Sequence, residues 1–91
     1  MSLIEEYINL AIELEKINRA GLSTKKDVKQ NNRLADRLRY IAKTIEAHNP
    51  EQKDGFSNLL FHNNLNVRIW CAHHMLEVMT YKSEQRRDAL Q

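Results

Sequence analysis

Hydrophobic residues recur at steps of three and four positions through the first twenty residues of the chain. On a helix, this spacing collects them into one apolar stripe. The stripe comprises Leu3, Tyr7, Leu10, Leu14 and Ile17. Gly21 follows directly, in the place where a left-handed glycine commonly ends a helix. The pattern therefore predicts an amphipathic helix that begins at Leu3 and ends before Gly21.

A second stripe follows, and it predicts a helix that runs to about Ala47. Its apolar members are Val28, Leu34, Leu38, Ile41, Ala42 and Ile45. Ser23 or Thr24 is the candidate N-cap. The Asn49-Pro50 pair marks the end, because proline disfavours helical geometry in the residue before it.

Viewed down the axis of this second helix, Asn31 projects into the apolar sector, at an angle between those of Leu34 and Leu38. Buried amides are normally hydrogen-bonded. We therefore expect a structural Asn31, bonded to the turn after the first helix or to neighbouring backbone; the alternative is that Asn31 contacts a ligand.

Two shorter helices are predicted next. One runs from Pro50 to Phe61, with Gly55 weakening its middle. Its expected buried residues are Phe56, Leu59 and Leu60. After a polar turn at residues 62–66, the other runs from about Leu65 to Met79.

The helix from Leu65 has apolar residues over more than half of its circumference. They are Val67, Ile69, Cys71, Ala72, Met75, Leu76, Val78 and Met79. Such a distribution predicts a helix covered on more than one side, at the centre of the fold. Ser83 is a candidate cap for a fifth helix containing Ala89 and Leu90.

No segment alternates with period two, so the fold class predicted is all-α, in one domain spanning residues 1–91. Composition agrees, because 42% hydrophobic and 29% charged residues exclude a disordered chain. Two glycines and one proline leave little material for a Gly-rich nucleotide loop. No apolar run approaches the roughly 20 residues of a membrane span, and no secretory signal opens the chain. We therefore expect a cytoplasmic protein without membrane contact.

The segment Leu59-Leu60-Phe61, a polar turn, Val67-Arg68 and Cys71-Ala72 is similar to a HEAT-type repeat. Such repeats pair a short helix ending in Leu-Leu with a second helix that opens on Val-Arg and carries small residues about five positions later. Together with Asn32-Arg33-Leu34 and the helix after it, the chain resembles a small bacterial HEAT-like family, the domain of unknown function numbered two thousand and nineteen.

The resemblance implies a right-handed α-α superhelix of HEAT-like hairpins with about five helices. It also implies that the second and fourth helices line one concave surface. Some relatives of this kind sit in bacterial toxin and immunity loci, which implies a protein partner. A solenoid of about two and a half repeats leaves an uncapped carboxyl-terminal end, so we expect a partner or self-association there.

The basic excess of the chain is local. Residues 21–48 carry seven basic and three acidic residues, whereas the whole chain has a net charge of only +2. At 100° per residue, one face of the second helix collects a basic ridge and an aromatic ring. The ridge comprises Lys26, Lys29, Arg33, Arg37 and Tyr40. It is a candidate surface for an acidic protein partner, against the alternative of an ordinary solvated face.

The narrow face of the fourth helix opposite its apolar arc holds Asn66, Trp70, His73 and Glu77. Trp70 is the only tryptophan, and tryptophan is over-represented among binding hot spots. We hypothesise that Trp70, His73 and Glu77 form a second partner-binding wall. The alternative is that Trp70 packs against the second or fifth helix.

Catalytic and metal-binding patterns are weak. Cys71 and His74 share a helix face, but a zinc site needs three or four ligands, and the neighbouring His62 and His73 do not complete a set. We interpret Cys71 as buried and inert. The paired acids Glu5-Glu6 and Glu13-Glu15 are expected on the solvent side of the first helix.

These patterns predict a protein that is not an enzyme and has no catalytic residues, metal or cofactor. The function they favour is a protein-binding module, of the kind found in immunity or toxin loci. The alternative is a helical-repeat protein that binds nucleic acid through the basic ridge, since phosphate contacts dominate such binding. The small net charge and the acids Asp27 and Asp36 argue against that alternative.

Overall fold

Residues 2–21 and 24–79 are described by a computed structural model, and helices dominate them. The elements are α1 (Leu3–Ala20), α2 (Lys25–His48), the 3-10 turn η1 (Pro50–Gln52), α3 (Lys53–Ser57), the 3-10 turn η2 (Asn58–Phe61) and α4 (Leu65–Glu77). No strand occurs in these residues, so the all-α prediction is confirmed for them. The predicted fifth helix with Ala89 and Leu90, and the end where we expected self-association, lie outside the described residues.

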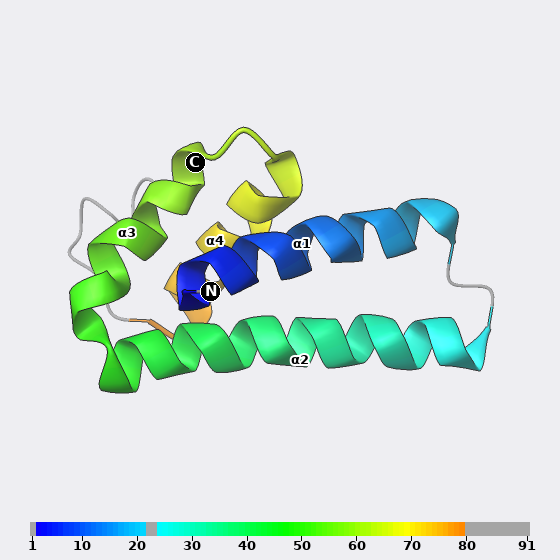
Figure 1. The fold of residues 1–91 in the computed structure, drawn as a ribbon, viewed down its shortest axis with the longest axis horizontal. Coiled ribbons are helices and arrows are strands. Elements are labelled where there is room, and N and C mark those ends of the chain that lie inside the picture. The colour runs from blue at the N-terminus through cyan, green and yellow to red at the C-terminus, as the bar shows by residue number, and fades with distance from the viewer. Residues whose placement is uncertain (1, 22–23, 80–91) are drawn as a thin grey trace.

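Helices α1 and α2 form an antiparallel hairpin, with α4 passing behind α1 in the view of Figure 1. The predicted cap of α2 is confirmed, because the Thr24 hydroxyl accepts a hydrogen bond from the Asp27 amide at 3.1 Å. Gly21 ends α1 with φ of 90° and ψ of 145°. Its φ is positive, as predicted for a glycine there, but its ψ is extended rather than left-handed helical.

The predicted helix from Pro50 to Phe61 is divided into η1, α3 and η2. Gly55 lies in the middle of the five-residue α3, where glycine is a poor helix former. Phe56 and Leu59 are buried as predicted, whereas Leu60 is only half-buried. The segment turns the chain between α2 and α4 rather than forming a full helix.

The core lies where α1, the second half of α2, residues 50–61 and α4 meet. Its buried apolar residues are Tyr7, Ala11, Leu14, Leu38, Ile41, Ala42, Ile45, Phe56, Leu59, Val67, Cys71, Met75 and Met79. Side chains from four parts of the chain thus bury one shared apolar cluster, the main stabilising contribution in a domain of this size.

The tip of the α1–α2 hairpin extends beyond this core. None of the described residues from Glu15 to Arg37 is buried. We call residues 15–21 and 24–33 the arm; it forms the right-hand part of the hairpin in Figure 1. The arm explains one wrong prediction, because Val28 was expected in the apolar stripe and is 42% exposed.

Helix α4 is less enclosed than its composition predicts. Val67, Cys71 and Met75 are buried, but Ile69 is 55% exposed and Leu65 is 61% exposed. The expectation that Ile69 is covered is therefore wrong, because no other described element packs on that side of α4. Within the described residues, no helix is both long and apolar enough to cross a membrane.

Candidate functional site

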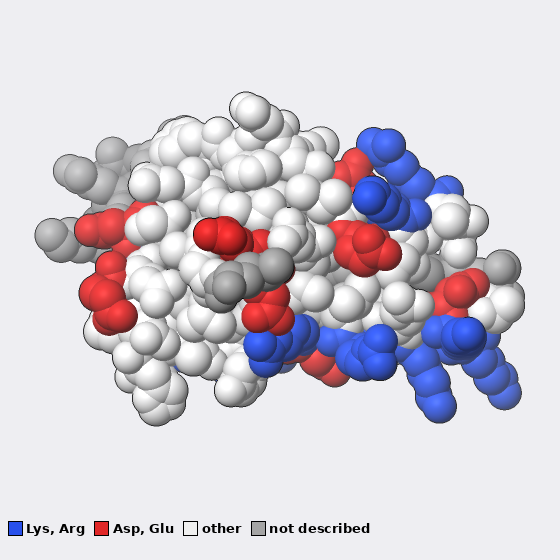
Figure 2. All heavy atoms as spheres, in the orientation of Figure 1, with Lys and Arg blue, Asp and Glu red and all other residues white. Residues whose placement is uncertain are grey.

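The predicted basic ridge lies on α2, and its first half lies on the arm. Lys26, Lys29 and Arg33 are all exposed. With Gln30 they line a hollow of about 360 Å³, which we call the basic hollow. Figure 2 shows lysine and arginine atoms gathered along the lower right edge, over this part of α2.

The cations of the basic hollow have no carboxylate partner in the described part of the chain. Arg37, Arg39 and Glu46 of α2 form ion pairs, and all three lie beyond Arg33. Three positive side chains therefore share one exposed face without a described counter-ion.

Arg37 belongs to the predicted ridge but is occupied within the fold. Its Nε and Nη2 donate to the two carboxylate oxygens of Glu6, at 2.7 Å and 3.0 Å. This bidentate hydrogen bond holds the pKa of Glu6 below its ordinary value. The Arg37 guanidinium also lies 5.0 Å from the ring centroid of Tyr40. Arg37 and Tyr40 thus form one cluster with Glu6.

The paired acids of α1 were all expected on its solvent side, and this prediction is only partly right. Glu5 and Glu13 are exposed, but Glu6 binds Arg37, and Glu15 binds both Arg19 and Asn64. Glu6 and Glu15 are half-buried because α2 and the amino-terminal end of α4 lie beside them.

Trp70, His73 and Glu77, the residues of the second hypothesised wall, lie on α4 and connect to α2 through an ion pair. Glu77 accepts from His73 Nε2 at 2.6 Å and pairs with Arg39 Nη2 at 3.1 Å. Trp70 is half-buried; its ring stacks on His74 at 5.6 Å and meets His73 edge-on at 6.1 Å. Arg39, which the sequence did not single out, is the α2 residue that reaches this wall.

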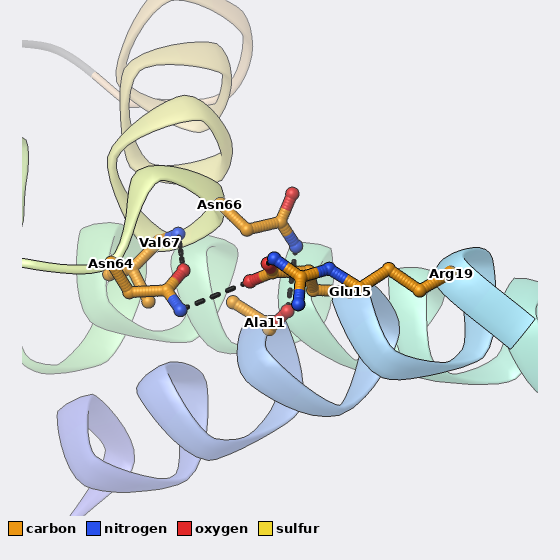
Figure 3. A network of polar contacts seen from close by, with 6 residues as sticks. All are labelled: Ala11, Glu15, Arg19, Asn64, Asn66 and Val67. Atoms are coloured by element: carbon orange, nitrogen blue, oxygen red, sulfur yellow. Dashed lines mark hydrogen bonds and ion pairs between the residues drawn. The ribbon is translucent and has the colours of Figure 1, made fainter.

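Asn66 was predicted on the narrow face of α4 opposite its apolar arc, but it is half-buried against α1. Its Nδ2 donates to the Ala11 carbonyl oxygen at 2.7 Å. Two residues earlier, Asn64 caps α4 by accepting from the Val67 amide and donates to Glu15 at 3.0 Å. Figure 3 shows both asparagines reaching from α4 to α1. The polar turn thus docks α4 on α1 as well as capping it.

A polar pair lies inside the core. The Tyr7 hydroxyl is 2.6 Å from His74 Nδ1. Burial, together with Cys71, raises the pKa of Tyr7, so the phenol keeps its proton and we assign it as the donor. Burial, followed by the influence of His73, lowers the pKa of His74 to about 4. His74 is therefore a neutral structural residue at neutral pH.

Cys71 is buried, as predicted. Burial raises the pKa of its thiol to about 12, and the sulfur donates to the Phe56 carbonyl oxygen at 3.2 Å. A thiol with so little thiolate is a poor nucleophile. Across residues 2–21 and 24–79, no three His, Cys, Asp or Glu side chains gather where they could hold a metal ion.

Asn31 departs from its expected role. It is half-buried, and its Oδ1 is shielded from solvent without a hydrogen-bond donor among the described residues. The turn after α1, one of its two expected partners, includes residues 22–23 and so lies partly outside the described residues.

Comparison with known proteins yields no match to a family model, a curated protein or a solved structure. The resemblance to HEAT-like proteins therefore rests on the residues that carry it.

Proposed function

We propose that this protein is a non-enzymatic protein-binding module whose partner presents an acidic surface to the arm. The observation that carries the proposal is the set of three exposed cations, Lys26, Lys29 and Arg33, with no described counter-ion. Like charges on one face repel each other, and an acidic partner relieves that repulsion. It also accelerates the encounter between the two proteins.

The proposed contact surface is narrower than the ridge in the sequence. Arg37 is bound to Glu6, and its guanidinium lies over the ring of Tyr40, so a partner that displaced Arg37 would break contacts within the fold. Trp70 packs on the core and stacks on His74. Of the second wall, His73 and Glu77 are exposed, but they pair with each other, and Glu77 also pairs with Arg39.

The proposal is tested by affinity capture from the source cell with wild-type protein and two double variants. Lys29→Glu with Arg33→Glu reverses two charges of the basic hollow, while Lys16→Glu with Lys43→Glu makes the same change in net charge at exposed positions outside the hollow. We expect a partner retained by wild type and by the control, and lost by the hollow variant. A partner captured equally by all three proteins rejects the basic hollow as the contact surface. A toxin gene next to this one would favour the immunity role.

Nucleic-acid binding is the second candidate, and the same three cations favour it. Because duplex binding releases about 0.9 counter-ions per phosphate contacted, three contacts predict a slope of log K against log salt near −3 at most. Fluorescence anisotropy with a labelled duplex measures this slope. Absence of binding at low salt rejects the candidate.

We also propose that the fold is a right-handed HEAT-like superhelix. The antiparallel pair of α1 with α2, followed by residues 50–61 packed against α4, supports it. So does Arg68 of the Val-Arg pair, whose Nη1 donates to the His62 carbonyl oxygen at 2.8 Å and thereby fixes the turn before α4. An experimental structure of the whole chain tests the proposal: successive hairpins must rotate in one right-handed sense.

A further inference from the structure

The positive charge around the basic hollow ends at Arg33 along α2. Beyond Arg33, the exposed Asp36 adds negative charge, and Arg37 is neutralised by Glu6. The positive surface therefore spans Lys26 to Arg33, about 10 Å of helix at 1.5 Å per residue, and the one acid within this span, Asp27, is half-buried and does not line the hollow. That length suits one compact anionic group better than a long acidic segment.

The charge in the hollow is placed where a helix tolerates it poorly. Lys26 and Lys29 lie in the first two turns of α2, where the helix dipole is already positive. No carboxylate lines the hollow among the described residues; its fourth lining side chain is the amide of Gln30, which donates hydrogen bonds without adding charge. Two lysines, an arginine and an amide side chain thus border one hollow.

We propose that the basic hollow binds a phosphate monoester, presented by a phosphorylated side chain of the protein partner. This inference rests on the function proposed above and names the chemistry of its contact. A phosphorylated side chain carries a charge of about −1.5 to −2 and three acceptor oxygens, which match the two lysines, the arginine and the amide. A carboxylate brings one negative charge and two oxygens, and a phosphodiester one negative charge per phosphate. The hollow therefore prefers the monoester to both.

The test follows the backbone amide signals of the ¹⁵N-labelled full chain during titration at low salt. The probes are blocked phosphoserine, inorganic phosphate, blocked glutamate and a short single-stranded oligonucleotide. We expect saturable shifts at Lys26, Lys29, Gln30 and Arg33 with phosphoserine, and at least about tenfold weaker binding of glutamate. Inorganic phosphate binding as tightly as phosphoserine identifies a site for free phosphate and overturns the partner assignment.

Matched variants locate the site. Lys29→Gln with Arg33→Gln should weaken phosphoserine binding about tenfold or more, whereas Lys16→Gln with Lys43→Gln, which removes the same charge elsewhere, should leave it within about twofold. Equal weakening by both pairs, or shifts scattered over the whole basic surface, overturns the inference. Tighter binding of the oligonucleotide than of phosphoserine also overturns it and favours the nucleic-acid alternative.

Phosphatase treatment separates the failure of this inference from the failure of the proposed function. A captured partner that loses binding after dephosphorylation supports both proposals. A partner that still binds through the arm after dephosphorylation leaves the protein-binding function standing and overturns the phosphate inference.

Discussion

The Tyr7 hydroxyl and the His74 imidazole meet at 2.6 Å in the core, although 67 positions separate them in the sequence. The contact joins α1 to α4, and Phe56 lies edge-on to Tyr7 at 4.9 Å. One buried hydrogen bond and one ring contact at Tyr7 thus tie together three parts of the chain.

Replacing Tyr7 by Phe should destabilise the protein by about 1–3 kcal/mol, because His74 Nδ1 is left buried without a donor. Urea denaturation at neutral pH measures the change in the free energy of unfolding. Tyr40→Phe is the matched control, since Tyr40 is 56% exposed, and it should change stability by less than about 0.5 kcal/mol. Equal effects of the two substitutions would contradict the structural role of the pair.

Stability should fall with acid through the titration of His74. Its pKa is about 4 in the fold, below the ordinary value near 6.5, so the unfolded chain binds more protons between these values. The contribution of His74 is therefore complete above about pH 6.5 and is lost as the pH falls towards 4, to a total of about 3 kcal/mol. Denaturation at several pH values measures it. His74→Gln, which does not titrate, should have a flatter slope over this range, and an unchanged slope would refute the assignment.

Asn66, which docks α4 on α1, should contribute to the stability of the protein, whereas its neighbour Asn63 should not. Asn66→Ala removes the hydrogen bond to the Ala11 carbonyl and should cost about 1 kcal/mol. Asn63 is exposed, so Asn63→Ala should have an effect within about 0.5 kcal/mol of zero. Thermal unfolding of both variants tests the difference, and comparable losses would mean that α4 docks without Asn66.

Asn31→Leu should stabilise the protein. The substitution removes a shielded acceptor without a described donor, a group that costs about 1–3 kcal/mol when buried. Asn32→Leu is the control, because it makes the same change in helix propensity at the next, exposed position. The gain from Asn31→Leu above that control, measured by urea denaturation, should be about 1 kcal/mol. A loss instead would show that the Asn31 amide has a partner.

Cys71 should be unreactive in the folded protein. With its thiol buried and its pKa raised to about 12, almost no accessible thiolate exists at pH 8. Ellman's reagent should react with the native protein only at the rate of unfolding, and at once in concentrated urea. Rapid reaction without denaturant would contradict the packing of α4.

Helix boundaries, caps and apolar stripes depend on residues close together in the sequence, so they can be predicted from local patterns. The stripe of α1, the Thr24 cap, the Asn49-Pro50 boundary and the buried Cys71 all follow from spacing and residue type. The contacts between distant segments do not: Tyr7 with His74, Glu6 with Arg37, and Arg39 with Glu77 depend on how the helices are placed.

The exposed apolar residues show the same limit. Val28 and Ile69 occupy apolar positions of their helices and are nevertheless exposed. The spacing of apolar residues predicts burial for them as it does for residues of the core. Whether they are buried depends on where a third element packs, and only the arrangement of the helices decides that. Spacing places the residues of the basic ridge on one face of the helix, but only the fold distinguishes Arg37, which Glu6 neutralises, from Arg33.

The length of α2 gives one helix two different environments. Leu38, Ile41, Ala42 and Ile45 are fully buried in its second half, whereas its first half pairs with α1 alone in the arm. Local opening of the arm breaks few apolar contacts, while opening of the second half requires the core to separate. Amide hydrogen exchange should therefore be fast along the first half of α2 and slow along the second. A ligand held on the arm would slow exchange in the first half and so reduce the difference within this single helix.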